Sequence, residues 1–260
     1  EYINSITFKY VASEHLWKII MICRYFSRLD TLIEIEKNGG FKTLADTGKT
    51  DLIRYIVNRR SQRMQPIVTG AFIVRARGKK HLWILDLVDI IEKKYPKLHS
   101  TLSYMKMEEV YELLMQFYGI GSFMAHQFVL DFSEVPHYLK NSEDYDSFTA
   151  AGPGSTRGMN RIIGRKPLDA SINKKIFNHL IMEMLSYWKS YVNREFINIM
   201  NLMISELTIF TEITDDLRKL TDKKLFRLMR LRASDVQHWL CEYDKYKRGG
   251  STKRRFNGKQ

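Results

Sequence analysis

The chain has 260 residues, with 42 Lys and Arg against 29 Asp and Glu, so its net charge at pH 7 is +13 with histidine neutral. Hydrophobic residues make up 44% of it and aromatic residues 12%, which excludes a disordered chain, and only 14 Gly and 5 Pro argue against a loop-rich β fold. The positive surplus predicts a polyanionic partner, most simply a nucleic acid, ahead of an anionic membrane surface or a structural role in a ribosome-like particle.

The cysteine content and the length of the apolar runs indicate in which cellular compartment the protein is found. Cys23 and Cys241 are too few and too far apart for a disulfide framework or a cysteine zinc site. No apolar run approaches the ~18 residues needed to cross a bilayer, and the N-terminus lacks the order of a signal peptide. We therefore expect an intracellular protein with no membrane partner.

The N-terminal part reads as helices followed by one ambiguous stretch. Apolar residues recur at steps of three and four from Ser13 to Ile35, which predicts a helix capped by Ser13 and broken or bent before Gly39. A second helix is predicted over Asp46 to Arg63, with a strongly basic end. Residues 67–83 fit a small β-hairpin by composition and a helix about equally well.

The rest of the chain is predicted to be helical. Helices are expected over 82–95, 107–118 and about 122–132, and the apolar residues from Ile172 to Phe210 again have helical spacing. The fold class is therefore mainly α. We expect a single helical domain over residues 1–248, or two lobes of about 1–105 and 106–248, followed by a basic flexible tail at 249–260.

A short glycine motif lies between two of these helices. Gly119, Ile120 and Gly121 form a Gly-hydrophobic-Gly pattern, typical of a helix-hairpin-helix whose small residues let backbone N–H groups approach a phosphate. The alternative is an ordinary helix–helix turn with a glycine at the C-cap. The charge of +13 favours a DNA-binding hairpin.

A second motif combines carboxylates with a rigid loop. Asp146, with Asp144 in reserve, falls where helix-hairpin-helix DNA glycosylases place a catalytic aspartate, and the alternative is an aspartate that caps the turn. We expect Gly152, Pro153 and Gly154 not to be helical, and Ser155 and Thr156 can cap the helix that follows. This loop and helix present candidate DNA-binding or phosphate-binding residues, namely Gly152, Gly154, Arg157, Asn160 and Arg161.

The helix predicted over 235–248 carries two possible ion pairs. Glu242 and Lys245 are three residues apart, and Asp244 and Arg248 are four apart. Such pairs are typical of a solvated helix surface. A carboxylate and a lysine held together beside aromatic residues also suit a site that activates an amine or binds a phosphoryl group, so Glu242 and Lys245 are candidate catalytic residues.

Further basic residues are candidate phosphate ligands, among them Arg28, which follows Arg24 by one helical turn, and Arg59. The alternative for each is a solvated face with local salt bridges. The chain has no P-loop, no Gly-x-Gly-x-x-Gly motif and no His-Glu-x-x-His motif, and its 7 histidines are scattered. No metal site is predicted.

Taken in order, these segments resemble the alpha-glutamyl/putrescinyl-thymine pyrophosphorylase family, also described as amino acid:DNA transferases. That family is akin to the helical domain attached to some 5-hydroxymethyluracil DNA kinases. The resemblance spans about residues 10–248. The matching segments are Arg24 to Thr31, Asn58 to Arg60, Thr69 to Ile73, Tyr118 to Gly121, Ala151 to Gly154 with Arg157 and Gly158, and Leu240 to Tyr246.

The resemblance implies a fold related to helix-hairpin-helix DNA glycosylases and action on double-stranded DNA with a flipped thymine derivative. An amine, either an amino acid or a polyamine, would displace pyrophosphate from 5-pyrophosphorylmethyl-uracil. The hairpin at Gly119 would hold the DNA backbone. Arg28, Arg59 and Arg157 would bind pyrophosphate, and Asp146 or Glu242 would serve as the base.

No cofactor is firmly implied, although Mg²⁺ held by one or two carboxylates is compatible with diphosphate chemistry. Two other functions stay open: a DNA glycosylase for a modified pyrimidine, and a non-catalytic helix-hairpin-helix module that binds DNA. In each case we expect a DNA-associated protein, in the host cytoplasm if it is encoded by a phage and in the nucleus if it is eukaryotic.

Overall fold

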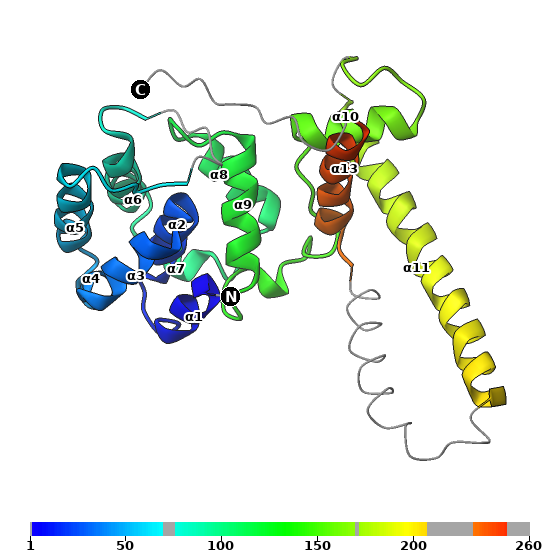
Figure 1. Cartoon of the computed structure of the whole chain (residues 1–260), viewed down its shortest axis with the longest axis horizontal. Coiled ribbons are helices and arrows are strands. Elements are labelled where there is room, and N and C mark those ends of the chain that lie inside the picture. Colours follow the sequence, from blue (N-terminus) through cyan, green and yellow to red (C-terminus); the bar gives the residue numbers. More distant parts are fainter. Residues whose placement is uncertain (1, 70–75, 170–171, 207–230, 249–260) are drawn as a thin grey trace. The chain divides into compact units, whose positions relative to one another are not determined.

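The computed structural model describes residues 2–69, 76–169, 172–206 and 231–248 (Figure 1). These residues form helices and loops with no strand among them, which confirms the mainly α fold class. The chain divides into two compact units, of which the first runs to Tyr145 and the second begins at Asp146. The predicted tail at 249–260 lies outside the described residues.

The first unit is built around one buried helix, α2 (Leu16–Phe26). Every residue of α2 except Arg24 is buried, because neighbouring helices cover it on all sides. The other elements of this unit are α1 (Tyr2–Lys9), α3 (Leu29–Lys37), α4 (Gly40–Thr47), α5 (Asp51–Gln62), α6 (Lys80–Lys94), α7 (Leu98–Thr101), α8 (Met107–Met115), α9 (Ser122–Ser133) and the 3-10 helix η1 (Leu139–Asn141). Helices α1, α3, α4, α6 and α9 pack against α2.

The break predicted between Ser13 and Gly39 is confirmed, and it falls at Ser27. This residue has φ +46 in the left-handed region, so α2 ends at Phe26 and α3 starts at Leu29, two residues after Ser27. The prediction of Ser13 as the cap is wrong: His15 occupies the N-cap of α2. The Ser13 hydroxyl instead donates to the Ala45 carbonyl at 2.8 Å, so it tethers the loop before α2 to α4.

A hairpin and a helix fitted residues 67–83 about equally well, and the structure has helix at the C-terminal end of this segment. Residues 70–75 lie outside the described residues. Lys80 to Trp83 form the first turn of α6. The buried positions of α6 recur at steps of three and four, at Ile84, Leu87, Val88 and Ile91. A strand would place alternate residues in the core instead. The spacing of the buried residues after Trp83 is therefore that of a helix, and this helix begins at Lys80.

The second unit contains α10 (Pro153–Ile162), α11 (Lys174–Glu206) and α13 (Ala233–Lys247), as Figure 1 shows. Helix α13 packs against both of the others. The core between them is apolar and consists of Met159, Ile172, Phe177, Ile181, Leu185, Ala233, Val236 and Leu240. Burial of this core is what holds the three helices together.

The loop that enters α10 is anchored on α13. The buried side chain of Gln237 accepts a hydrogen bond from the Ala150 N–H at 2.7 Å and donates one to the Ala150 carbonyl. The Ala233 N–H donates to the Asp146 carbonyl at 2.9 Å. These bonds replace the secondary-structure partners that a loop lacks, so the segment with the predicted site residues has a defined conformation.

Candidate functional site

Two glycines let α10 and α13 approach each other closely. A Cβ atom placed on Gly158 would lie 2.1 Å from the carbonyl oxygen of Leu240, and one on Gly154 would lie 3.1 Å from Cys241 Sγ. The prediction that Pro153 and Gly154 are not helical is wrong, because α10 begins at Pro153, the first helical position, where proline is tolerated. Gly152, and not Ser155 or Thr156, is the N-cap, and its N–H donates to Ser155 Oγ at 3.1 Å. Gly152 therefore caps the start of α10, and Gly154 and Gly158 allow α10 to pack closely on α13. This close packing brings the side chains of the two helices together.

Three arginines meet at one buried carboxylate where these helices pack. The side chain of Asp244 has no exposed surface, and its oxygens lie 2.8 Å from Arg157 Nε, 3.1 Å from Arg161 Nε and 3.1 Å from Arg248 Nη2. We call these four residues the arginine cluster. Three guanidinium groups and one carboxylate have a formal charge of 3 − 1 = +2, so the cluster attracts anions even with Asp244 ionised.

The arginine cluster keeps Asp244 ionised. Burial by itself opposes ionisation of this carboxyl, but hydrogen bonds from Arg157 and Arg161 and the charge of Arg248 outweigh it, so the pKa of Asp244 is lowered. The arginine side chains are 24%, 24% and 29% exposed, which leaves them accessible from solvent. Because a guanidinium has five N–H donors, each has donors left for a phosphate or a pyrophosphate.

Asn160 lies on α10 between these arginines in the sequence. It is buried, and its Nδ2 donates to the Pro167 carbonyl at 3.4 Å, in the loop after α10. Its amide is therefore turned to the protein interior, in contrast to the neighbouring Arg161.

The predicted catalytic carboxylates of the second unit have exposed or partly exposed side chains. Asp146 is exposed, and its backbone carbonyl holds the start of α13. Glu242 lies 2.5 Å from Lys245, and these side chains are 49% and 58% exposed. The hydrogen bond from Lys245 lowers the pKa of Glu242, which makes this carboxylate a weaker base.

Asp144, the reserve candidate, caps a helix. Its two oxygens accept hydrogen bonds from the backbone N–H groups of Met107 and Glu108, at 2.8 and 2.9 Å, at the N-terminus of α8. Ser142 Oγ donates to the same carboxylate at 2.6 Å. Asp144 therefore satisfies helix donors that have no partner within α8.

We expect Asp144→Ala to destabilise the first unit by about 1 to 2 kcal/mol, because the substitution removes a charged cap from two N–H groups of α8. Asp146→Ala is the matched control, since that side chain is exposed, and it should leave the free energy of unfolding within about 0.5 kcal/mol of the parent. Urea unfolding of both variants measures the difference. Equal loss in the two variants would contradict the capping role.

The predicted hairpin joins α8 and α9, which pack against each other. Gly119 has φ +89, a conformation that residues with a side chain rarely adopt, and Ile120 is buried. Gly121 is the N-cap of α9, and no atom lies within 4 Å of the position that a Cβ would occupy there. The first glycine therefore makes the turn and the second leaves open space; DNA binding by this turn stays a prediction.

The basic residues of the first unit differ in how far they are neutralised. Arg28 Nε lies 2.8 Å from Asp30, and the same carboxylate lies 2.9 Å from Arg60. Arg60 is buried and also pairs with Glu34 at 2.5 Å. Arg59 is exposed, and within the described ranges no ion pair involves it. Of the two predicted phosphate ligands in this unit, Arg59 is the one whose charge is not neutralised locally.

The model of the 5-hmdU DNA kinase helical domain matches residues 6–254, which is nearly the whole chain. The chain belongs to this family. No match was found among curated proteins or among solved structures. Membership of the 5-hmdU DNA kinase helical domain family fits a role in DNA modification at thymine, and it confirms the related family in the resemblance described above.

None of the helices in the described ranges is long and apolar enough to span a membrane. Residues 2–69, 76–169, 172–206 and 231–248 contain no group of three or more His, Cys, Asp or Glu side chains able to hold a metal ion. Mg²⁺ held by one or two carboxylates stays a prediction.

Sequence reasoning missed the meeting of α10 and α13 at Asp244. It paired Asp244 with Arg248 along one helix, and it treated Arg157 and Arg161 as separate candidates. A signal was present, since Arg157 and Arg161 are a like-charged pair one turn apart and such a pair is unfavourable without a carboxylate between them. That carboxylate is 87 residues from Arg157 in the chain, beyond the reach of any local pattern.

Proposed function

We propose that this chain acts on DNA that carries a pyrophosphorylated derivative of 5-hydroxymethyluracil, and that it replaces the pyrophosphate by an amine, either an amino acid or a polyamine. The arginine cluster is the observation that carries the proposal. It offers a charge of +2 and partly exposed guanidinium donors, which suit a diphosphate leaving group, in a chain that belongs to the 5-hmdU DNA kinase helical domain family.

The proposed reaction is a substitution at the methylene carbon attached to C5 of the uracil. The amine nitrogen forms a bond to this carbon while the bond from carbon to the pyrophosphate oxygen breaks, and pyrophosphate leaves with the electron pair. The ammonium proton goes to a carboxylate of the protein. The reacting base must leave the helical stack to reach protein groups. The arginine cluster stabilises the charge that develops on the leaving group.

Asp146 fits the role of base better than Glu242 does. Glu242 is held by Lys245, and the lowered pKa of Glu242 reduces its tendency to take a proton. Asp146 is exposed at the start of the loop that leads to Gly152 and α10. This loop is anchored through Ala150 and Asp146 itself to α13, the helix that contributes Asp244 and Arg248. In this proposal Glu242 and Lys245 support the orientation of the amine during its transfer to the base.

Mass spectrometry of nucleosides tests the proposal. DNA containing 5-pyrophosphorylmethyl-uracil is incubated with the full chain and a mixture of amino acids and polyamines, then digested and analysed. We expect a thymidine adduct of one amine. Asp146→Asn should lower the yield by a factor of about 100 or more, as loss of a general base does. Asp169→Asn, which alters a surface pair with Arg165, should leave the yield unchanged.

The same experiment separates the alternatives. Abasic sites in place of an adduct would indicate a glycosylase. Unchanged DNA together with tight, salt-sensitive binding would indicate a non-catalytic DNA-binding module. The second of these is the stronger rival, because the Glu242–Lys245 pair has the exposure and spacing of an ordinary surface ion pair.

A further inference from the structure

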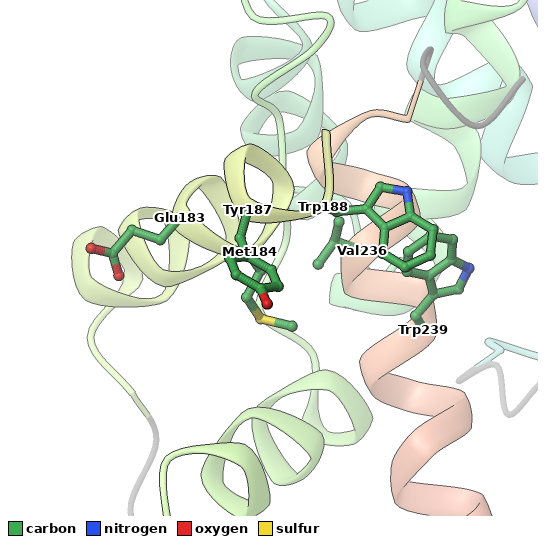
Figure 2. Close-up of a pocket in the computed structure, with 6 residues that line it drawn as sticks. All are labelled: Glu183, Met184, Tyr187, Trp188, Val236 and Trp239. Carbon is green, nitrogen blue, oxygen red and sulfur yellow. The ribbon is translucent and has the colours of Figure 1, made fainter. Parts of the chain in front are cut away.

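The second unit contains a pocket that none of the roles above uses. It lies between α11 and α13, has a volume of about 420 Å³ and is lined by Glu183, Met184, Tyr187, Trp188, Val236 and Trp239 (Figure 2). This volume is in the range of small-molecule sites. Apolar and aromatic side chains form most of its wall, so a ligand here must have an apolar body.

Aromatic side chains at this pocket are left exposed to solvent. The rings of Trp188 and Trp239 pack edge to face, with centroids 5.5 Å apart and an interplanar angle of 73°. Trp239 is nevertheless 41% exposed and Tyr187 is 73% exposed. Large aromatic residues gain much from burial, and adjacent exposed ones mark a surface that a ligand can cover. These rings are therefore available to a small molecule.

The charge at the pocket is opposite to that of the chain. Glu183 is the one charged residue among the described residues that line it, although the whole chain has a charge of +13. Aromatic faces also carry partial negative charge, so they attract cations and repel anions. Figure 2 shows the two indoles on one side of Met184 and Tyr187 and the Glu183 side chain on the other, at the outer edge, where its carboxylate points away from the indoles and is 62% exposed.

We propose that this pocket binds an organic cation with an apolar body, such as an alkyl diamine. One ammonium group lies against the indoles of Trp188 and Trp239, the methylene chain contacts Met184 and Tyr187, and a second ammonium group pairs with Glu183. His179 Nε2 lies 3.4 Å from this carboxylate, so the ligand competes with it for Glu183. The further identification of this ligand as the amine co-substrate rests on the proposed function, whereas cation binding does not.

Binding is measured on the full chain without DNA. The chain is titrated with 1,4-diaminobutane and followed by tryptophan fluorescence and by calorimetry. We expect saturable binding that Trp239→Leu weakens about tenfold through loss of the cation–π contact. Glu183→Gln should weaken it about threefold, as expected for an exposed ion pair. Glu195→Gln, on the same helix and outside the pocket, is the matched control and should bind like the parent.

Comparison of the diamine with other ligands tests whether the pocket selects for a cation. 1-Butanol, which has the apolar chain without a charge, should not bind measurably. Equal binding of 1-butanol, binding of thymidine monophosphate in preference to the diamine, or unchanged diamine affinity in Trp239→Leu and Glu183→Gln would overturn the proposal. Circular dichroism confirms that these variants fold, which is expected because Trp239 is 41% exposed and the side chain of Glu183 is 62% exposed.

The two proposals fail in different ways. Diamine binding without transfer to DNA would keep the pocket and remove the proposed reaction. Transfer of an amine to DNA at the same rate in Trp239→Leu would keep the reaction and show that its amine binds elsewhere.

Discussion

Gly158→Ala is expected to destabilise the second unit by about 3 kcal/mol or more, at the upper end of the cost of overpacking a core. The added Cβ would lie 2.1 Å from the Leu240 carbonyl oxygen and 2.7 Å from its carbonyl carbon, and these are backbone atoms that no rotamer change can move. Helices α10 and α13 must therefore separate. Denaturant unfolding followed by the fluorescence of Trp188 and Trp239 measures the loss.

Gly154→Ala is the matched control on the same helix. Its Cβ would meet Cys241 Sγ at 3.1 Å, the end of a short side chain that needs to move only slightly. Alanine also favours a helix over glycine by about 1 kcal/mol, so this variant should be within about 1 kcal/mol of the parent. A Gly158→Ala variant as stable as Gly154→Ala would mean that α10 and α13 do not pack this closely.

Asp244→Asn is expected to cost about 3 kcal/mol of stability in the second unit at pH 7. The amide has nearly the size of the carboxylate, so packing is kept, but three guanidinium groups are left without their counter-charge. Removal of one member of a buried ion pair costs about 3 to 5 kcal/mol, and the partial exposure of the arginines places this case at the lower end. Urea unfolding of both proteins at pH 7 measures the effect.

The pH dependence separates the charge of Asp244 from its packing. The pKa of Asp244 is lowered in the folded chain, so its charge stabilises the fold above the unfolded pKa of about 3.9. This stabilisation is lost as the pH falls through the lower pKa of the folded state. The difference between parent and Asp244→Asn should therefore shrink below about pH 4. A difference of the same size at pH 2 and pH 7 would show that packing, and not charge, is responsible.

Local pattern was sufficient for most of the secondary structure. Steps of three and four predicted α6, α8, α9, α11 and α13 to within a few residues, because burial of one face of a helix requires that spacing whatever the partner is. The same reasoning failed at Ser13, which has a typical capping side chain yet bonds to Ala45 in α4. Whether a capping residue caps depends on what else lies within reach.

The candidate site was only partly predictable. The sequence marked Arg157, Arg161, Glu242 and Lys245 as candidates, and it left Asp144 and Asp146 as alternatives for one role. Tertiary structure assigned Asp144 to the N-terminus of α8, more than 30 residues away in the chain, and left Asp146 exposed. It also showed that the Gly154 and Gly158 positions face α13. These outcomes depend on which helices pack together.

The sequence by itself determined that this is a basic, mainly helical protein with a turn at Gly119, and that it resembles a family of enzymes acting on thymine in DNA. Tertiary structure alone decided that Asp244 neutralises one charge of three arginines, and that two tryptophans on different helices form a pocket. Helix periodicity records only which face of a helix is buried. The partner across that face comes from distant parts of the chain, and distance and burial, which set the strength of each contact, exist only once the helices have packed.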